Sequence, residues 1–325
     1  MENIKPKISI IVPAKNAVLT LAKCIGSLKA LDYQDFEIII VDDGSTDTTR
    51  DIIKGFSGVT LITTGGVGPS KARNLGIEKA TGEYIAFTDA DCVVEKNWLS
   101  ELLNGFTLTP IPYSLSSVVA VGGDQKSPDD DSAFGKTVHG FLKAIGFVAD
   151  YVKSGGGMPV ETKHNPSCNV MYKTEVLKQS GGFLENLWPG EDLELDYRLK
   201  KKGCTFLYNP GAVVYHYRTS DMKGFKRMMF SYGRVQALLA RMYGPFRFIH
   251  FVPVFVLTAI VLSLTLPLIV LVLSAAFLFI GWSYMAMKSK SIKVGFIYLR
   301  LLIVTLVYWN LGFARGLTAK IPPRA

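Results

Sequence analysis

The segment from Phe248 to Met287 contains no charged residue and is almost entirely apolar. At about 1.5 Å of rise per residue, a single helix of this length would be about twice as long as the hydrocarbon core of a bilayer is thick. We therefore expect a hairpin of two membrane helices, at about 248–265 and 267–287, that turns near Ser263 to Pro267. This feature predicts that the C-terminal part of the chain lies in a membrane.

A second apolar stretch runs from Val294 to Ala314 and contains one charged residue, Arg300. Its length is sufficient for a third membrane helix. A third span would carry the basic tail of the chain to the outside, whereas basic residues tend to stay in the cytosol. Two interpretations therefore remain open: a third span at about 294–314, and an interfacial or re-entrant helix.

The charge of the chain is unevenly distributed. The formal net charge is +9, from 36 Lys and Arg against 27 Asp and Glu, yet residues 247–325 contain eight basic residues and no acidic one. A basic, acid-free and aliphatic segment is typical of a membrane region rather than of a nucleic-acid interface. Because both ends of the hairpin are basic, we expect a multi-pass protein of the cell membrane with a cytosolic N-terminal domain.

Residues 222–243 are predicted to form an amphipathic helix. At about 100° per residue, apolar side chains such as Phe225, Met229 and Leu239 share one face. The opposite face carries basic residues: Lys223, Arg227, Arg234 and Arg241. Such a helix can lie at the lipid headgroups or pack on a soluble domain, and the two interpretations are compatible. The chain is thus expected to have three parts: a catalytic domain at 1–218, a juxtamembrane helix at 219–246 and a membrane region at 247–325.

Four cysteines lie far apart in the sequence: Cys24, Cys92, Cys168 and Cys204. With no C-x-x-C pair among them, their spacing supports neither a zinc site nor a disulfide framework. We expect ordinary buried thiols in a reducing compartment.

The first part of the chain alternates between strand-like and helix-like segments. Short runs rich in β-branched and aromatic residues lie at 8–12, 36–41, 59–63 and 84–88. This alternation predicts an α/β fold of the Rossmann-like kind, with a mostly parallel central sheet and helices on both faces. In such sheets ligands bind at the carboxyl ends of the strands.

Acidic residues follow two of these strands. Asp42 and Asp43 follow the second, and Asp89 and Asp91 follow the fourth. Because carboxylates alone would repel a phosphorylated ligand, a divalent cation is the natural bridge between them and a diphosphate. Asp89 and Asp91 can reach one ion only if the chain turns there, since an extended strand sends such a pair to opposite faces. The alternatives are a solvated turn for this pair and a helix N-cap for the first pair.

Glu191 and Asp192 precede another helix-like segment. Acidic residues at this position can simply favour the helix dipole. The functional alternative is a carboxylate that acts as a general base at the rim of a cleft.

Five ordered sequence blocks stand out: Ser9–Asn16, Ile40–Asp47, Ala72–Ile77, Gly82–Asp91 and Gly181–Asp192. Together they resemble glycosyltransferase family 2 over roughly residues 7–218. The resemblance implies a GT-A fold, a nucleotide-sugar donor, a Mg²⁺ or Mn²⁺ ion, and inversion at the anomeric carbon.

The resemblance also implies roles for individual residues. The residues expected on the nucleotide-sugar side are Pro13, Ala14, Asn16, Asp42, Asp43, Arg73, Asp89 and Ala90. Asp42 or Asp43 would face the base, and Arg73 would lie near the diphosphate. Asp91 would be the principal metal ligand, with Asp89 beside it; His216 would be a further ligand or else a core residue of a strand. Asp192 matches the position of the general base, and Glu191 would be its catalytic neighbour.

Two departures from the family pattern bear on function. Ala17 stands where many members carry Glu, which leaves one contact to the nucleotide undefined. No Q-x-x-R-W follows Glu191 and Asp192, which argues against a processive polymer synthase. A single transfer is the better interpretation.

These observations predict a membrane-bound, inverting enzyme that moves one sugar from a UDP- or GDP-sugar to a polyprenyl phosphate or a lipid-linked glycan. Its partners would be the donor, the acceptor and the bilayer, with no nucleic acid; the oligomeric state stays undefined. One alternative is a membrane sugar-phosphate nucleotidyltransferase, although its first loop would need the glycines that Pro13–Asn16 lacks. Another is a catalytically silent membrane scaffold that binds nucleotide-sugars, against which the acidic residues argue.

Overall fold

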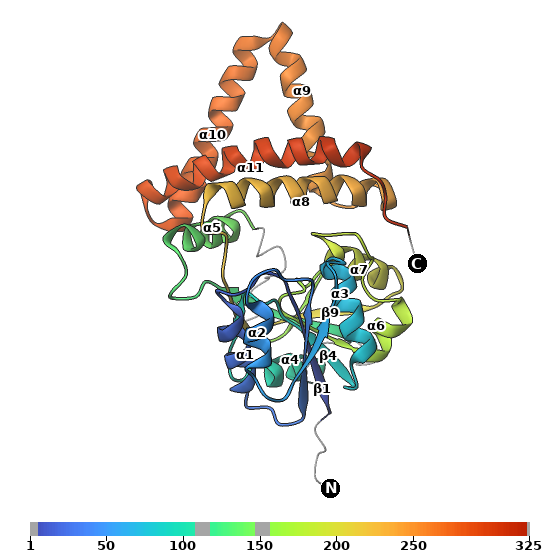
Figure 1. Ribbon diagram of the computed structural model, residues 1–325. Helices are drawn as coiled ribbons and strands as arrows, with labels where there is room; N and C mark the ends of the chain where they lie inside the picture. Colours follow the sequence, from blue (N-terminus) through green and yellow to red (C-terminus); the bar gives the residue numbers. More distant parts are fainter. Residues whose placement is uncertain (1–5, 108–117, 147–156, 324–325) are drawn as a thin grey trace. The chain divides into compact units, whose positions relative to one another are not determined.

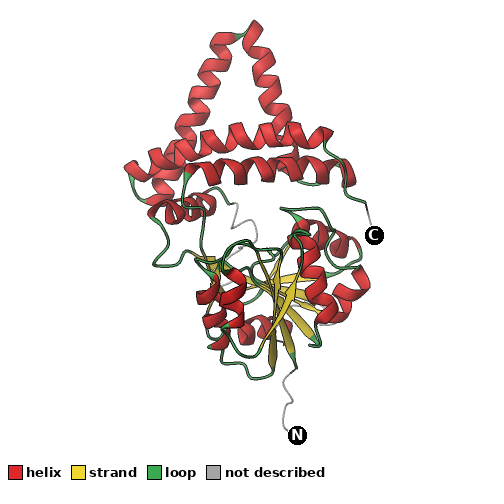
Figure 2. Ribbon diagram, in the orientation of Figure 1, coloured by secondary structure: helices red, strands yellow, loops and turns green. Residues whose placement is uncertain are grey.

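The computed structural model describes residues 6–107, 118–146 and 157–323 and divides into two compact units. The first unit consists of Met1–Asp131, Val148–Tyr217 and Pro322–Ala325, and the second of Ser132–Phe147 and Arg218–Ile321. Within the described residues, all the strands belong to the first unit, whereas the second is helical (Figure 2).

The described residues of the first unit form a nine-stranded sheet. Its strands are β1 (Ile8–Ala14), β2 (Phe36–Asp42), β3 (Val59–Thr63), β4 (Tyr84–Phe87), β5 (Cys92–Val94), β6 (Val118–Lys126), β7 (Val160–Thr162), β8 (Val170–Lys173) and β9 (Thr205–His216). Their order in space is β3-β2-β1-β4-β8-β6-β9-β5, and β7 pairs with β9.

The prediction of a parallel sheet is confirmed for β1 to β4. β1 lies between β2 and β4 and is parallel to both, and β3 is parallel to β2. The rest of the sheet is mixed, because β8 runs antiparallel to β4 and β6, and β5 runs antiparallel to β9. The four residues between β4 and β5 are too few for the crossover that two parallel neighbours need, so β5 pairs elsewhere.

Helices cover both faces of this sheet, as predicted. They are α1 (Leu21–Lys29), α2 (Thr49–Lys54), α3 (Pro69–Lys79), α4 (Trp98–Thr107), α6 (Thr174–Ser180) and α7 (Glu191–Lys201). Figure 1 shows α1, α2 and α4 on one side of the sheet and α3, α6 and α7 on the other. Successive side chains of β1 point to opposite faces of the sheet: Ile10 packs in the core with α1 and α4, and Ile11 packs in the core with α3. Each such buried side chain contributes about 1.5–3 kcal/mol to folding.

The second unit consists of helices in the described residues. They are α5 (Ala133–Ala144), α8 (Met222–Tyr243), a short 3₁₀-helix (Phe248–Phe251), α9 (Val252–Thr265), α10 (Pro267–Ser289) and α11 (Ile292–Thr318). The amphipathic helix predicted at 222–243 coincides with α8. α5 is inserted between β6 and β7 in the chain, yet Phe141 in it packs edge-on against Phe225 of α8 and Tyr298 of α11. An insertion of the sheet domain thus belongs to the helical unit.

α9 and α10 form the predicted hairpin. α9 ends at Thr265 and α10 begins at Pro267, because a proline is well placed at the start of a helix and cannot continue the preceding one. Among the residues that the structure describes, three helical segments are long and apolar enough to cross a membrane: Phe248–Thr265, Pro267–Ser289 and Ile292–Thr318. In each of the first two segments, only 6% of the most apolar 18-residue stretch is buried, which suits helices surrounded by lipid.

α11 differs from the hairpin helices because it lies along α8 (Figure 1). Glycines allow the close approach: a Cβ atom at Gly312 would collide with the Phe230 carbonyl oxygen, and one at Gly316 with that of Arg234. Arg241 of α8 donates from Nη1 to the carbonyl oxygen of Ala319, just beyond the end of α11, at 2.6 Å. In α11, 22% of the most apolar 18-residue stretch is buried, so part of this apolar helix is covered by protein.

Candidate active site

The acidic pair Asp89 and Asp91 lies in a turn between β4 and β5. The backbone N–H of Cys92 donates to the carbonyl oxygen of Asp89 at 3.0 Å, so the chain turns as a shared ion requires. His216, the last residue of β9, pairs in register with Cys92. One ligand atom each of Asp89, Asp91 and His216 lies within 4.8 Å of the others, and His216 Nε2 is 3.4 Å from Asp91 Oδ1. The structure thus brings the three expected metal ligands together.

Arg73 of α3 connects this group to the start of α7. Its Nη2 donates to Asp89 Oδ1 and its Nη1 donates to Glu191 Oε1, both at 2.7 Å. The residue is 2% exposed, and its guanidinium lies over the ring of Phe183. Burial opposes the charge of Arg73, but the two carboxylates outweigh burial and raise its pKa. A cation is therefore fixed inside the site.

Glu191 and Asp192 point into different surroundings although they are adjacent. Glu191 is buried beside Arg73, and burial raises the pKa of its carboxyl; Arg73 opposes this shift, whereas the negative charge of Asp192 adds to it. Asp192 has an 18% exposed side chain that accepts from the backbone N–H of Ser167 at 3.0 Å. It also accepts from the N–H of Leu193 in the first turn of α7 at 2.7 Å. Of the two, Asp192 is the carboxylate that solvent reaches.

His164 lies next to Asp192 and was not singled out from the sequence. Its Nδ1 is 2.8 Å from Asp196 Oδ2, and its Nε2 is 4.0 Å from Asp192 Oδ2. Asp196 is fully buried and also accepts from the Tyr172 hydroxyl at 2.6 Å. The spacing of Asp192 and Asp196, four residues apart on one face of a helix, was the available signal for this group.

The loops after β1 and β2 hold each other in place. Asn16 has a positive φ of 50°, its side-chain oxygen accepts from the Thr46 N–H at 2.9 Å, and its own N–H donates to Ser45 Oγ at 2.9 Å. Pro13 and Ala14 form the end of β1, and the Ala14 carbonyl accepts from the Asp43 N–H. The expected nucleotide-side residues are therefore gathered at one edge of the sheet.

Asp42 and Asp43 are both buried and hydrogen-bonded within the protein. Asp42 Oδ2 accepts from Arg50 Nη2 at 2.7 Å. Asp43 accepts from the Thr64 hydroxyl at 2.6 Å and from the N–H groups of Val67 and Gly68. Burial alone would raise the pKa of Asp43, but these hydrogen bonds outweigh burial and lower it. The two carboxylates anchor the loops, and the contact of either with a base stays a prediction.

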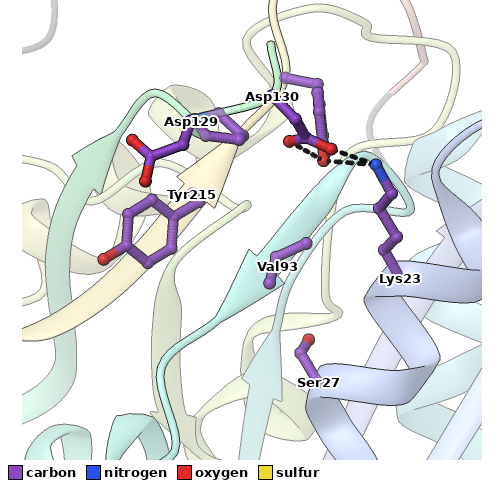
Figure 3. Close-up of a pocket in the computed structure, with 8 residues that line it drawn as sticks. Lys23, Ser27, Val93, Asp129, Asp130 and Tyr215 are labelled. Carbon is purple, nitrogen blue, oxygen red and sulfur yellow. Dashed lines mark hydrogen bonds and ion pairs between the residues drawn. The ribbon is translucent and has the colours of Figure 1, made fainter.

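A pocket of about 500 Å³ opens elsewhere in the first unit (Figure 3). In it, Lys23 forms an ion pair with Asp130, which also accepts from the Tyr217 hydroxyl at 2.6 Å. Its strand residue Tyr215 points to the face of β9 opposite His216, because successive residues of a strand alternate. The pocket nevertheless borders the acidic turn, because the backbone N–H of Tyr217, which also lines the pocket, donates to the carbonyl oxygen of Asp91 at 3.0 Å.

Ala90, which separates the two aspartates of the turn, is buried in the hydrophobic core. Its side chain thus fixes the turn to the core. A contact between Ala90 and the donor stays a prediction. The same turn leads into Cys92, whose thiol lies close to Cys168 and His216. The sequence spacing of these cysteines gave no indication of that contact.

Comparisons with known structures define the class of fold. The mannosyltransferase PcManGT from Pyrobaculum calidifontis, solved with GDP-Man and Mn²⁺, matches 97% of this chain and 88% of its own with a TM-score of 0.61 and 19% identity. GalNAc-T7, solved with UDP, GalNAc and Mn²⁺, matches 73% of this chain and 51% of its own with a TM-score of 0.51 and 18% identity. The sheet domain therefore has the GT-A fold of glycosyltransferases.

Sequence comparisons agree with the fold. The chain belongs to glycosyl transferase family 2, whose family model matches residues 9–179. Glycosyltransferase AglE of Haloferax volcanii is 34% identical over 66% of this chain and 68% of its own length. A dolichyl N-acetyl-α-D-glucosaminyl phosphate glucuronosyltransferase of Methanococcus voltae, specific for a diacetamido sugar by its name, is 27% identical over 72% of this chain and 74% of its own. The pre-mycofactocin glycosyltransferase of Mycobacterium tuberculosis is 25% identical over 72% of this chain, which spans only about half of that relative.

Proposed function

We propose that this glycosyltransferase moves one sugar from a nucleotide-sugar to a membrane-associated acceptor, with inversion and with the help of a divalent cation. The acceptor class is a polyprenyl phosphate or a lipid-linked glycan. The observation that carries the proposal is the position of Arg73, whose guanidinium bridges Asp89 of the acidic turn and Glu191 beside Asp192. The buried guanidinium of Arg73 thus connects Asp89, on the proposed donor side, with Glu191, the neighbour of the proposed base Asp192.

The residues of the turn suit a hard cation. Asp89 and Asp91 offer carboxylate oxygens and His216 offers an imidazole nitrogen, a donor set that Mg²⁺ and Mn²⁺ accept. The two GT-A structures solved with Mn²⁺ support this assignment. When bound, such an ion neutralises charge on the diphosphate leaving group. Asp91, the more exposed carboxylate of the pair, would be the principal ligand.

Arg73 acts through its neighbours. Both terminal nitrogens of its guanidinium are engaged by carboxylates, so we assign it the task of holding Asp89 and Glu191 in fixed orientations. Glu191 in turn begins α7 and thereby sets the position of Asp192. The nucleotide would lie along the edge formed by Pro13, Ala14 and Asn16, as the family resemblance implies.

Asp192 is the proposed general base. Its partly exposed carboxylate would take the proton from the acceptor hydroxyl as the oxygen attacks the anomeric carbon. An ionised carboxylate can only accept, so the N–H of His164 Nδ1 donates a hydrogen bond to Asp196 Oδ2, and this bond holds the ring with Nε2 at 4.0 Å from Asp192 Oδ2. His164 is therefore a positioning residue for the base.

The second unit suits an acceptor carried by lipid. α9 and α10 have the length and exposure of a membrane hairpin, and the packing of α11 along the basic helix α8 favours an interfacial position for that pair. The name of the Methanococcus voltae relative describes a dolichyl phosphate-linked substrate. The basic residues that flank the hairpin support a multi-pass protein with a cytosolic catalytic domain. External labelling, on intact cells, of a cysteine placed at Leu266 tests this topology; labelling of one at Lys290 instead would contradict it.

Thermal unfolding with a panel of nucleotides tests the donor class. We expect one nucleoside diphosphate and its sugar conjugates to raise the melting temperature of the full chain in detergent, and only with Mg²⁺ or Mn²⁺ present. The matched control is Asp91→Asn, which should lose the metal-dependent part of the shift. If no nucleotide changes the melting temperature with either ion, the proposal is wrong.

A further inference from the structure

Two buried cysteines meet the imidazole of His216. Cys92 begins β5 and is the cross-strand partner of His216, and Cys168 lies two residues before the start of β8. The Sγ atoms of both cysteines and one nitrogen of His216 lie within 4.8 Å of one another. Both thiols are free and buried, and the Cys168 side chain interacts with Cys92 and with His216. Three segments far apart in the sequence thus supply three ligand atoms.

We propose that Cys92, Cys168 and His216 form a site for a thiophilic divalent cation such as Zn²⁺. Zinc is bound in proteins by two cysteine thiolates and a histidine nitrogen in an open tetrahedral arrangement, in which two sulfur ligands lie about 3.8 Å apart. The three ligand atoms therefore need only a small movement to close on one ion. The two thiols lose their protons when the ion binds.

The ligand chemistry separates this site from the acidic turn. Carboxylates select Mg²⁺ and Mn²⁺, whereas thiolates select zinc and other soft ions. Cys24, the other cysteine near the turn, contacts the carbonyl oxygen of Asp89 instead and does not join the three ligands. An ion in the thiol site would therefore bind through Cys92, Cys168 and His216 rather than through Asp89.

His216 belongs to both groups of ligands. Gln125 Oε1 lies 3.4 Å from Nδ1, and Asp91 Oδ1 lies 3.4 Å from Nε2, so Nε2 is the nitrogen that faces the acidic turn. The proposal places the soft ion on this same nitrogen, which is then not available to the ion held by Asp89 and Asp91. Occupation of the thiol site should therefore oppose the Mg²⁺- or Mn²⁺-dependent reaction. This consequence rests on the proposed function, whereas binding of the soft ion does not.

Cobalt(II) is a spectroscopic substitute for zinc and tests the site directly. The full chain in detergent, kept reduced, is titrated with Co²⁺, and the near-ultraviolet thiolate-to-cobalt absorption is recorded. We expect a band that saturates at one ion per chain and disappears when Zn²⁺ is added. Cys168→Ser and Cys92→Ser should each bind Co²⁺ about tenfold more weakly or worse. Cys204→Ser is the matched control and should behave like the wild type, because Cys204 is outside the group.

Two further measurements make the result decisive. His216→Gln tests the third ligand without altering a thiol, and it should shift the cobalt band as well as weaken binding. Circular dichroism identifies any variant that fails to fold. If one variant fails to fold, cobalt binding by the folded variants tests the site. The absence of a cobalt band in the reduced wild type, or an undiminished band in a folded Cys168→Ser variant, would overturn the proposal.

An activity assay then examines the shared histidine. Zn²⁺ should inhibit Mn²⁺-supported transfer by the wild type and by Cys204→Ser, and Cys168→Ser should need about tenfold more Zn²⁺ for the same inhibition. Equal inhibition of all three would disprove competition for His216. A cobalt band without any transfer activity would leave the thiol site established and count against the proposed function instead.

Discussion

Arg73 and Glu191 form an ion pair that is buried on both sides. Nη1 donates to Oε1 at 2.7 Å, and the two residues lie 118 positions apart in the sequence. A second bond from Nη2 to Asp89 makes the guanidinium the link between α3, the acidic turn and α7. Burying such a pair costs desolvation free energy. Replacing one partner leaves the other as a buried charge without its counter-ion.

Arg73→Lys should therefore damage both stability and activity. A lysine ammonium cannot bridge two carboxylates in the planar manner of a guanidinium. We expect a loss of about 3 kcal/mol in the free energy of unfolding, measured with urea, and a clear fall in kcat. The control is Lys71→Ala on the same helix, whose exposed ion pair with Glu185 should matter by about 0.5 kcal/mol or less. Wild-type stability in Arg73→Lys would refute the bridging role.

Asp192→Asn should remove the general base and leave donor binding nearly intact. The amide cannot accept the proton of the acceptor hydroxyl, so kcat should fall by about 10²–10⁴-fold while the Kd of the nucleotide-sugar changes little. Steady-state kinetics and calorimetry measure the two quantities. Unchanged turnover with a hydroxyl acceptor would exclude Asp192 as the base. With a lipid phosphate, which is already ionised, the loss should be much smaller, so its size also reports the acceptor class.

His164→Gln tests the group behind the base. The variant keeps a hydrogen-bonding side chain but lacks the rigid imidazole ring that lies between Asp196, at 2.8 Å from Nδ1, and Asp192, at 4.0 Å from Nε2. We expect kcat to fall by up to about 10²-fold, with little change in donor KM, because the carboxylate is misplaced rather than lost. In the Asp192→Asn background the same substitution should add little. Full additivity of the two losses would argue against their acting together.

Much of the first half of the fold could be predicted from the sequence because its pattern is local. Short β-branched runs alternate with helical ones up to Phe87, and Pro267 marks the hairpin turn by its own geometry. The pairing of β5 with β9 was not predictable in this way, since it joins Cys92 to His216 over a long separation. For the same reason α5 could not be assigned to the helical unit, because Phe141 finds its partners on α8 and α11.

The candidate site shows the same division. Asp89, Asp91 and Asp192 stand in recognisable blocks, whereas Cys168 and His164 stand in none. Their partners come from other strands and helices, and only the folded chain brings them together. Asp43 could be identified as a candidate from its sequence block, but its hydrogen-bond partners could not. It accepts three hydrogen bonds from the protein, and these depend on the loop that contains Gly68.

Asp43 should make stability depend on pH in a defined direction. Its pKa is lowered in the folded protein, so its contribution is complete above the usual carboxyl pKa and is lost as the pH falls through the lower, folded value. Asp43→Asn should cost about 2 kcal/mol at neutral pH. The difference from the wild type should shrink in acid, as measured by urea unfolding at several pH values. A difference that grows in acid would contradict the sign.

The most direct test of the account is sugar transfer itself, followed by the movement of a labelled sugar into the lipid phase. Membranes that contain the wild-type protein are incubated with the nucleotide-sugar identified by thermal unfolding, together with Mn²⁺ and a polyprenyl phosphate. We predict labelled lipid with the wild type, and almost none with Asp91→Asn or after removal of the metal. Label that stays in the aqueous phase with the wild type, the metal and every donor that binds would contradict the proposed function.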